Sequence, residues 1–131
     1  MVFKPIIEYI KLLGLEEELY IGIENKKEYF LYDKKEDNFY LYDFTLRNQK
    51  IIIEYNGVTF HPNKNKLTES EWKTWSEPYS NMKADEKYNY DQIKIKYAEK
   101  HGFKILEIWS DETVEDNINI IKDFLYNNIE L

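Results

Sequence analysis

The spacing of apolar residues predicts three helices in this chain. Apolar side chains recur at helical intervals in residues 5–13, 84–101 and 114–128. Gly14 and Gly102 follow the first two segments, at the position where glycine commonly ends a helix. We therefore expect one helix near each end of the chain and a long helix between them.

Shorter segments rich in Tyr, Ile and Phe predict β-strands between these helices. They are expected at residues 19–24 and 27–32, as one or two strands, and at 39–46, 50–55 and 103–109. We also expect a turn at 33–38, an antiparallel meander over 27–55, and a long loop with one helical turn at 61–83.

The order of these elements predicts an α/β fold. The chain runs helix, three strands, helix, strand, helix, and a helix between the third strand and the last is typical of a crossover connection. Such a connection brings the last strand back in parallel, so we expect a mixed central sheet flanked by helices. A chain of 131 residues has the length of a single domain, 1–131.

The composition excludes several classes of protein. Hydrophobic residues make up 43% of the chain, which is too many for a disordered acidic segment. The absence of cysteine excludes disulfides, a thiolate nucleophile and a Cys-ligated metal centre. The apolar runs are too short to cross a bilayer, and the first residues carry Glu8 within their apolar stretch and no small-residue cleavage site. We therefore expect a soluble intracellular protein with no membrane partner.

The net charge of −7 is unevenly distributed along the chain. Residues 1–43 carry six basic and ten acidic side chains, and residues 105–131 carry one basic and seven acidic. Between them, residues 44–104 carry eleven basic and eight acidic side chains. A basic segment is the usual electrostatic signature of nucleic-acid contact, so the acidic average does not exclude such a partner.

Two acids interrupt apolar segments at the start of the basic region. Asp43 lies in one expected strand and Glu54 in the next, where it shares a face with Ile52. A carboxylate on so apolar a face is costly unless it is paired or binds a metal, and two carboxylates are ligands that Mg²⁺ prefers. His61 follows the turn at Gly57, where an imidazole can reach the same place as a general acid or base.

Each of these residues also has an ordinary structural explanation. Single acids on strands commonly keep an edge strand soluble, and a lone histidine is most often a surface loop residue. The combination favours a site: Asp43, an acid at the end of an Ile run, an Asn-Gly turn, and His61 directly before Pro62.

The stretch YDFTLRNQKIIIEYNGVTFH, residues 42–61, resembles the catalytic core of PD-(D/E)xK-type nucleases. It is most similar to the branch that includes very-short-patch mismatch-repair endonucleases and phage homing endonucleases, described by an E-D-x-H-D pattern. A second block, DQIKIKYAEKHG at 91–102, is similar to the D-x-x-K-x-x-x-A-x-x-x-G helix of that family. The resemblance covers about residues 5–111 and implies a restriction-endonuclease-like αβββαβ core, which a helix at 114–128 would close.

Carried over residue by residue, the resemblance implies a metal site. Asp43 would be the principal ligand, and Glu54 and the backbone carbonyl of Tyr55 would complete the site. The implied cofactor is Mg²⁺, with Mn²⁺ as a substitute.

The same resemblance implies further catalytic residues. His61 would be the general acid or base or would hold the scissile phosphate, and Asp91 would orient it. Lys94 would contact the phosphate. Glu8 matches an acid of the first helix that faces the site in this family.

One motif position departs from the family pattern. Many of these enzymes have lysine two residues after the strand acid, and this chain has Asn56 there. Three explanations remain open at this stage: Lys94 substitutes from the helix, His61 takes over the role, or the activity has been lost.

The basic segment supplies the residues expected to contact DNA. Lysines bind phosphates without reading sequence, and aromatic side chains stack on bases. The candidates are Lys64, Lys66, Trp72, Lys73, Trp75 and Lys96. The equal alternative for the two tryptophans is that they anchor the loop to the core. Because Arg47 is the single arginine, strong sequence readout by this domain alone is not expected.

These observations predict a Mg²⁺-dependent DNA endonuclease or nickase of phage or mobile-element type. Its partner would be double-stranded DNA, it could act as a homodimer, and it would work in the cytoplasm of a prokaryotic or phage-infected cell. Two alternatives remain: a nuclease-fold module that binds DNA without cutting it, and an acidic protein that mimics DNA.

Overall fold

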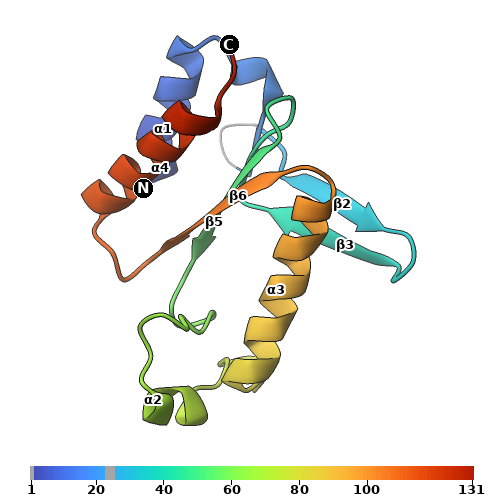
Figure 1. The fold of residues 1–131 in the computed structure, drawn as a ribbon, viewed down its shortest axis with the longest axis vertical. Coiled ribbons are helices and arrows are strands. Elements are labelled where there is room, and N and C mark those ends of the chain that lie inside the picture. Colours follow the sequence, from blue (N-terminus) through green and yellow to red (C-terminus); the bar gives the residue numbers. More distant parts are fainter. Residues whose placement is uncertain (1, 23–25) are drawn as a thin grey trace.

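A computed structural model of the protein describes residues 2–22 and 26–131. Within these ranges it has a four-stranded sheet in the order β1-β4-β5-β6 and a two-stranded ribbon, β2-β3. The elements are α1 (Phe3–Leu12), the 3₁₀ turn η1 (Glu16–Glu18), β1 (Leu19–Ile21), β2 (Tyr29–Asp33), β3 (Asn38–Tyr42), β4 (Phe44–Leu46), β5 (Ile51–Asn56), α2 (Glu69–Thr74), α3 (Ala84–Lys100), β6 (Lys104–Trp109) and α4 (Val114–Asn128). Helices α1 and α4 lie side by side, and α3 runs along the other side of the sheet (Figure 1).

Strand β5 contributes to the core on both faces of the sheet. Ile51 and Ile53 are fully buried among the apolar residues of α1 and α4. Ile52 is fully buried in a second cluster, with Ala98 of α3. Because alternate residues of a strand point to opposite faces, Glu54 lies on the Ile52 side, toward α3. The apolar pattern of β5 thus determines where its one acid points.

Strands β5 and β6 pair in parallel, with Ile51 opposite Lys104 and Glu54 opposite Glu107. Helices α2 and α3 lie in the connection between them. Strands β1, β4 and β5 pair antiparallel, so the sheet is mixed. The α/β class, the mixed central sheet flanked by helices and the crossover are therefore confirmed.

The segment 39–46, expected as one strand, is two strands that are separated at Asp43. Strand β3 pairs with β2, whereas β4 pairs with β1 and β5. At the break, the N–H of Asp43 donates to the side chain of Glu54 instead of to a strand backbone. The expected single meander over 27–55 is therefore wrong, because this region forms two antiparallel hairpins in different sheets.

The predicted glycine stops after the first two helices are confirmed, although α1 begins at Phe3, two residues before its predicted start. Gly14 and Gly102 follow α1 and α3 with φ of 73° and 88°, a conformation that glycine adopts without strain. The long segment 61–83 is largely irregular, and α2 within it begins with a capping box between Thr68 and Glu71. The expected strand at 19–24 is β1 as far as Ile21, and its residues 23–24 lie outside the described ranges.

Candidate functional site

Asp43 and Glu54 meet at the break between β3 and β4. The N–H of Asp43 donates to Oε1 of Glu54 at 2.8 Å, and the N–H of Tyr55 donates to Oδ2 of Asp43 at 2.8 Å. The Glu54 carboxylate is thus held by the backbone of Asp43, and the Asp43 carboxylate by the backbone of the residue after Glu54. The three residues predicted for a metal site lie together, and we call Asp43 and Glu54 the carboxylate pair.

Lys94 approaches the carboxylate pair from α3. Its Nζ donates to Oε2 of Glu54 at 2.7 Å and lies 5.1 Å from the centre of the Tyr42 ring. The Tyr42 hydroxyl donates to the Lys94 carbonyl at 2.9 Å, which fixes the helix against the strand. A lysine therefore reaches the strand acid although Asn56 occupies the motif position.

Glu54 is only 6% exposed, and its environment changes its acidity. Burial, together with the negative charge of Asp43, raises the pKa of Glu54 to about 7, against the opposing effect of Lys94. The carboxyl group therefore exchanges its proton near neutral pH. A cation that binds here has to compete with that proton and with Lys94.

The raised pKa of Glu54 predicts a pH-dependent stability. From about pH 4.5 to 7 the folded protein keeps a proton that the unfolded chain has released, so stability falls as pH rises, by about 3 kcal/mol at most. Urea unfolding at both ends of this window measures the effect. Glu54→Gln does not titrate and is expected to lose less stability over the window than the wild type. Exposed Glu17→Gln is the control, and equal losses in all three proteins would contradict the prediction.

His61 forms a second pair with Asp91, which shares a face of α3 with Lys94. Nδ1 of His61 lies 2.8 Å from Oδ2 of Asp91, and Nζ of Lys87 donates to Oδ1 at 2.6 Å. Burial alone would raise the pKa of Asp91, but the hydrogen bonds from His61 and Lys87 outweigh it and hold the pKa below its ordinary value. Because an ionised carboxylate only accepts, Nδ1 of His61 carries the proton and Nε2 remains for acid–base chemistry.

The local sequence explains why these side chains converge. Lys87, Asp91 and Lys94 are spaced by four and three residues, so they share one face of α3. His61 follows a tight turn in which its N–H donates to the carbonyl of Gly57 at 2.9 Å. The turn directs the chain from the end of β5 toward α3.

Sequence reasoning missed Glu107. It lies on β6 opposite Glu54, and burial raises its pKa although a hydrogen bond with Asn56 lowers it. With Asn56 and Asp91 it lines a small polar pocket of about 110 Å³. The sequence could have indicated Glu107, because it is an acid within the apolar stretch FKILEIW. If the two strands are assumed to pair in parallel, it also lies at the same register position as Glu54.

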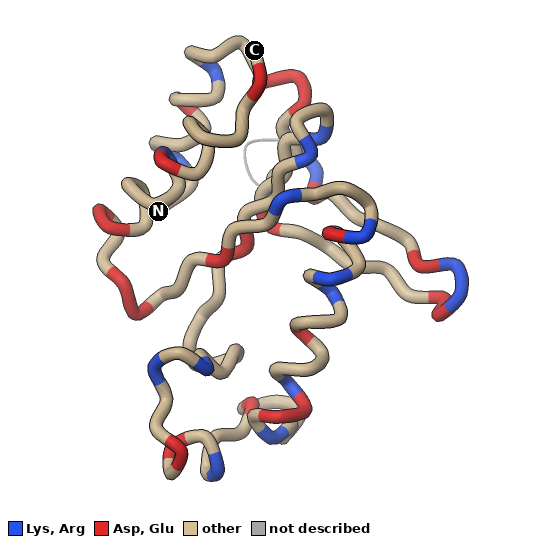
Figure 2. The backbone as a smooth tube through the Cα atoms, in the orientation of Figure 1, with Lys and Arg blue, Asp and Glu red and all other residues tan. Residues whose placement is uncertain are grey.

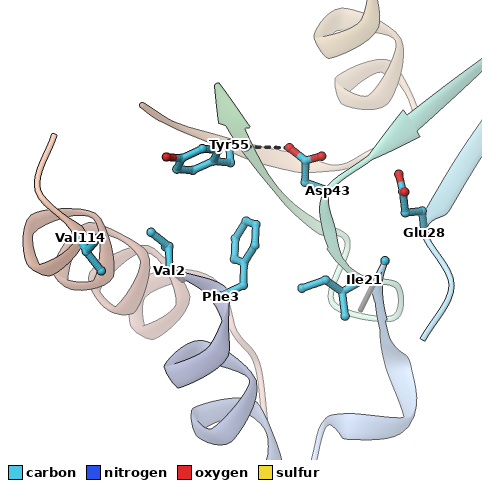
Figure 3. A pocket seen from close by; sticks show the side chains of 8 residues that line it. Val2, Phe3, Ile21, Glu28, Asp43, Tyr55 and Val114 are labelled. Carbon is cyan, nitrogen blue, oxygen red and sulfur yellow. Dashed lines mark hydrogen bonds between the residues drawn. The ribbon is translucent and has the colours of Figure 1, made fainter. Parts of the chain in front are cut away.

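Glu8 does not join the site, against expectation. The apolar residues Ile6, Ile7 and Ile10 take the buried face of α1, which leaves Glu8 in solvent. Its carboxylate lies 3.6 Å from Nζ of Lys11 on the same helix. Another acid, Glu28, lines a pocket together with Asp43, and no pattern in the sequence indicated it (Figure 3).

The residues predicted to contact DNA are distributed over the long loop and α3, where basic and acidic positions alternate (Figure 2). Lys64, Lys66, Lys73 and Lys96 are all exposed; Lys66 is held by Asp111 and Glu112, and Nζ of Lys73 lies 3.4 Å from Oε1 of Glu69. The exposed lysines remain accessible to a phosphate backbone.

The tryptophans of the loop differ from the expectation of free stacking surfaces. Trp72 donates from Nε1 to Asp85 at 2.8 Å and contacts the Tyr88 ring edge-on, and Trp75 is half-buried. Trp72 therefore packs α2 against α3.

The donor set of the carboxylate pair fits a hard cation in part. Oδ1 of Asp43 has no hydrogen bond within the described ranges, whereas both oxygens of Glu54 are engaged. Among the residues that the structure describes, no three His, Asp or Glu side chains form a group that could hold a metal ion. A bound cation would therefore take Asp43, Glu54 and the Tyr55 carbonyl, all of them oxygen ligands, and complete its shell with water.

Comparisons with known proteins yield one distant relative. A Haemophilus influenzae protein, described only as an uncharacterized protein, is 23% identical to this chain over 123 residues. The match covers 94% of this chain and 59% of that protein, so the chain spans somewhat more than half of the relative's length. No family model matches the chain, and no solved structure matches it. In the described ranges, no helix is long and apolar enough to cross a membrane.

Proposed function

We propose that the protein is a Mg²⁺-dependent DNA endonuclease or nickase. The observations that carry this proposal are the pairing of Asp43 with Glu54, the contact of Lys94 with Glu54, and the His61–Asp91 pair, whose Asp91 shares a face of α3 with Lys94. Phosphodiester hydrolysis needs three parts: oxygen ligands that can hold a cation, a cationic side chain, and an oriented imidazole.

Each group has a defined role in this proposal. Asp43, Glu54 and the Tyr55 carbonyl would hold a divalent cation, which when bound would supply an activated water and stabilise charge on the phosphate. His61 moves a proton through Nε2, while Asp91 fixes its tautomer and orientation. Lys94 balances the charge of Glu54 in the structure and would contact the scissile phosphate in the complex with DNA.

The surface near His61 supports DNA as the substrate. Phe60 and Tyr79 stack with ring centres 5.8 Å apart and planes 8° apart, and Tyr79 is 85% exposed. Exposed aromatic rings offer stacking surfaces for bases, and the lysines of the loop and α3 offer phosphate contacts. We place the reaction in the cytoplasm of a prokaryotic or phage-infected cell. Because the chain has one proposed site, cutting both strands would require two successive binding and cleavage events or a second copy of the chain.

Relaxation of supercoiled plasmid tests the proposal. With Mg²⁺ or Mn²⁺ the wild-type protein is expected to convert supercoiled DNA to the open-circular form, and EDTA is expected to abolish the conversion. Gel electrophoresis over a range of protein concentrations measures it. No metal-dependent conversion at any concentration would refute an endonuclease.

A second candidate function is a DNA-binding module of the same fold without catalysis. Two observations favour it: Nζ of Lys94 occupies Oε2 of Glu54, and Asn56 stands where many enzymes of the family that the sequence resembles carry lysine. Fluorescence anisotropy separates the two candidates. Salt-sensitive duplex binding without plasmid relaxation selects the module.

A further inference from the structure

A pocket of about 450 Å³ opens next to Asp43, on the face of the sheet that α1 and α4 cover (Figure 3). Its apolar lining includes Phe3, Ile21, Tyr55 and Val114. The volume lies within the range of small-molecule sites. The roles proposed above use Asp43 at its edge and leave the rest of the pocket unexplained.

The walls of the pocket suit a flat apolar group. Tyr55 is 39% exposed and Val114 is 53% exposed, so both present apolar surface that the core does not bury. Phe3 is buried and stacks on Phe44 with ring centres 5.4 Å apart, which fixes the position of its ring. An aromatic ring of a ligand gains most from such walls, because it can stack on Tyr55.

The polar part of the pocket is acidic. Glu28 and Asp43 line it from one side, while Tyr55 and Val114 lie on the other (Figure 3). Glu28 packs against Gly22, where an added Cβ would come within 3.0 Å of Oε1. Carboxylates repel phosphate and accept hydrogen bonds from amino groups. The pocket therefore excludes a phosphate and favours a ring that carries an exocyclic amine.

We propose that this pocket receives one unstacked base of the DNA strand whose phosphate lies at the carboxylate pair, and that cytosine and adenine are preferred over thymine. Their amino groups donate to Glu28, and thymine offers only a carbonyl oxygen at the corresponding position. The inference rests on the proposed function, since it requires a strand at the carboxylate pair. Asp43 belongs both to the carboxylate pair and to the lining of the pocket, so a base in the pocket would lie next to a phosphate at the carboxylate pair.

Short single strands test the proposal without any cleavage, because their bases are already unpaired. The ¹⁵N-labelled protein is titrated with d(CCC), d(AAA) or d(TTT) in Ca²⁺ while NMR follows the amides of Gly22, Asp43, Tyr55 and Val114. We expect saturable shifts at these amides, with d(TTT) binding about fivefold more weakly or worse than the other two.

Two variants and two matched controls decide the interpretation. Val114→Trp fills the pocket and is expected to abolish the shifts, whereas Ile120→Trp on the same helix is expected to retain them. Glu28→Gln adds a donor and is expected to remove the discrimination against d(TTT). Glu36→Gln, at the exposed tip of the ribbon, is expected to preserve it.

The opposite results would overturn the proposal. These are no saturable shift at the four amides, equal binding by Val114→Trp, and equal binding of all three strands by the wild type. Free dCMP that binds as tightly as d(CCC), or trilysine that shifts the same amides, would assign the pocket to another ligand. Plasmid relaxation with no shift refutes the pocket alone, whereas pocket shifts without relaxation refute the nuclease alone.

Discussion

Replacing Asp43 by asparagine is expected to lower Mg²⁺-dependent plasmid nicking about 10³-fold or more. In the proposed mechanism a bound cation would contribute several kcal/mol of transition-state stabilisation, and each 1.36 kcal/mol corresponds to a factor of ten in rate. Asparagine retains an oxygen that accepts from the Tyr55 N–H, so the strand ends remain joined. The variant removes the negative charge while preserving this hydrogen bond.

Thermal unfolding provides a second measurement on the same variant. A cation that binds only the folded state raises the Tm, so the wild type is expected to gain stability with Mg²⁺ or Mn²⁺ and Asp43→Asn is not. Asp123→Asn, an exposed position on α4, serves as the control and should behave like the wild type. If Asp43→Asn nicks plasmid as fast as the control, the carboxylate pair is not the metal site and the nicking comes from another source.

The second large effect is expected at His61. His61→Ala should reduce nicking by about 10² to 10⁴-fold, the usual contribution of a general acid or base. The chain offers a matched control, because His101 is its other histidine and lies exposed at the end of α3, with Nδ1 2.8 Å from the Tyr97 carbonyl. His101→Ala should retain full activity. Rates from plasmid relaxation under excess enzyme measure both variants.

Duplex affinity distinguishes the two roles of His61. A proton-transfer role leaves binding in Ca²⁺ within about twofold of the wild type, while a phosphate-holding role weakens binding along with the rate. If His61→Ala and His101→Ala nick equally fast, the His61–Asp91 pair has no catalytic part. It would then serve only to fasten the turn after β5 to α3.

The elements of this fold follow closely from local sequence signals. The long helix, the final strand and the last helix, α3, β6 and α4, are bounded by caps and glycines that act within a few residues. The break at Asp43 could not be predicted in this way. It depends on a hydrogen bond to Glu54, eleven residues away along the chain, which replaces a strand–strand bond. The alternation of side chains along residues 39–46 continues through Asp43, so this pattern alone predicts one unbroken strand.

The candidate site was predictable where motif and periodicity agree. Asp91 and Lys94 share a helix face by spacing, and the structure brings them to His61 and Glu54 respectively. Glu8 illustrates the limit of this reasoning. Helix α1 turns its isoleucines toward the core, and Glu8 therefore lies on the opposite side of the helix, in solvent. Whether an acid meets the site thus depends on the packing of the whole helix.

The parallel pairing of β5 and β6 also has a consequence for how the protein is made. Asp43, Glu54, His61 and Lys94 all precede β6 in the chain, yet β5 obtains its parallel neighbour only when Ile51 meets Lys104. Contacts between such distant residues form late, because closing the loop between them costs conformational entropy before the contacts themselves stabilise the chain. On the ribosome, the nascent chain therefore carries the side chains of the candidate site before it carries the strand that completes the sheet around them. Helix α4 then covers the core from the last part of the sequence. Synthesis itself delays assembly of the site until nearly all of the described fold has emerged.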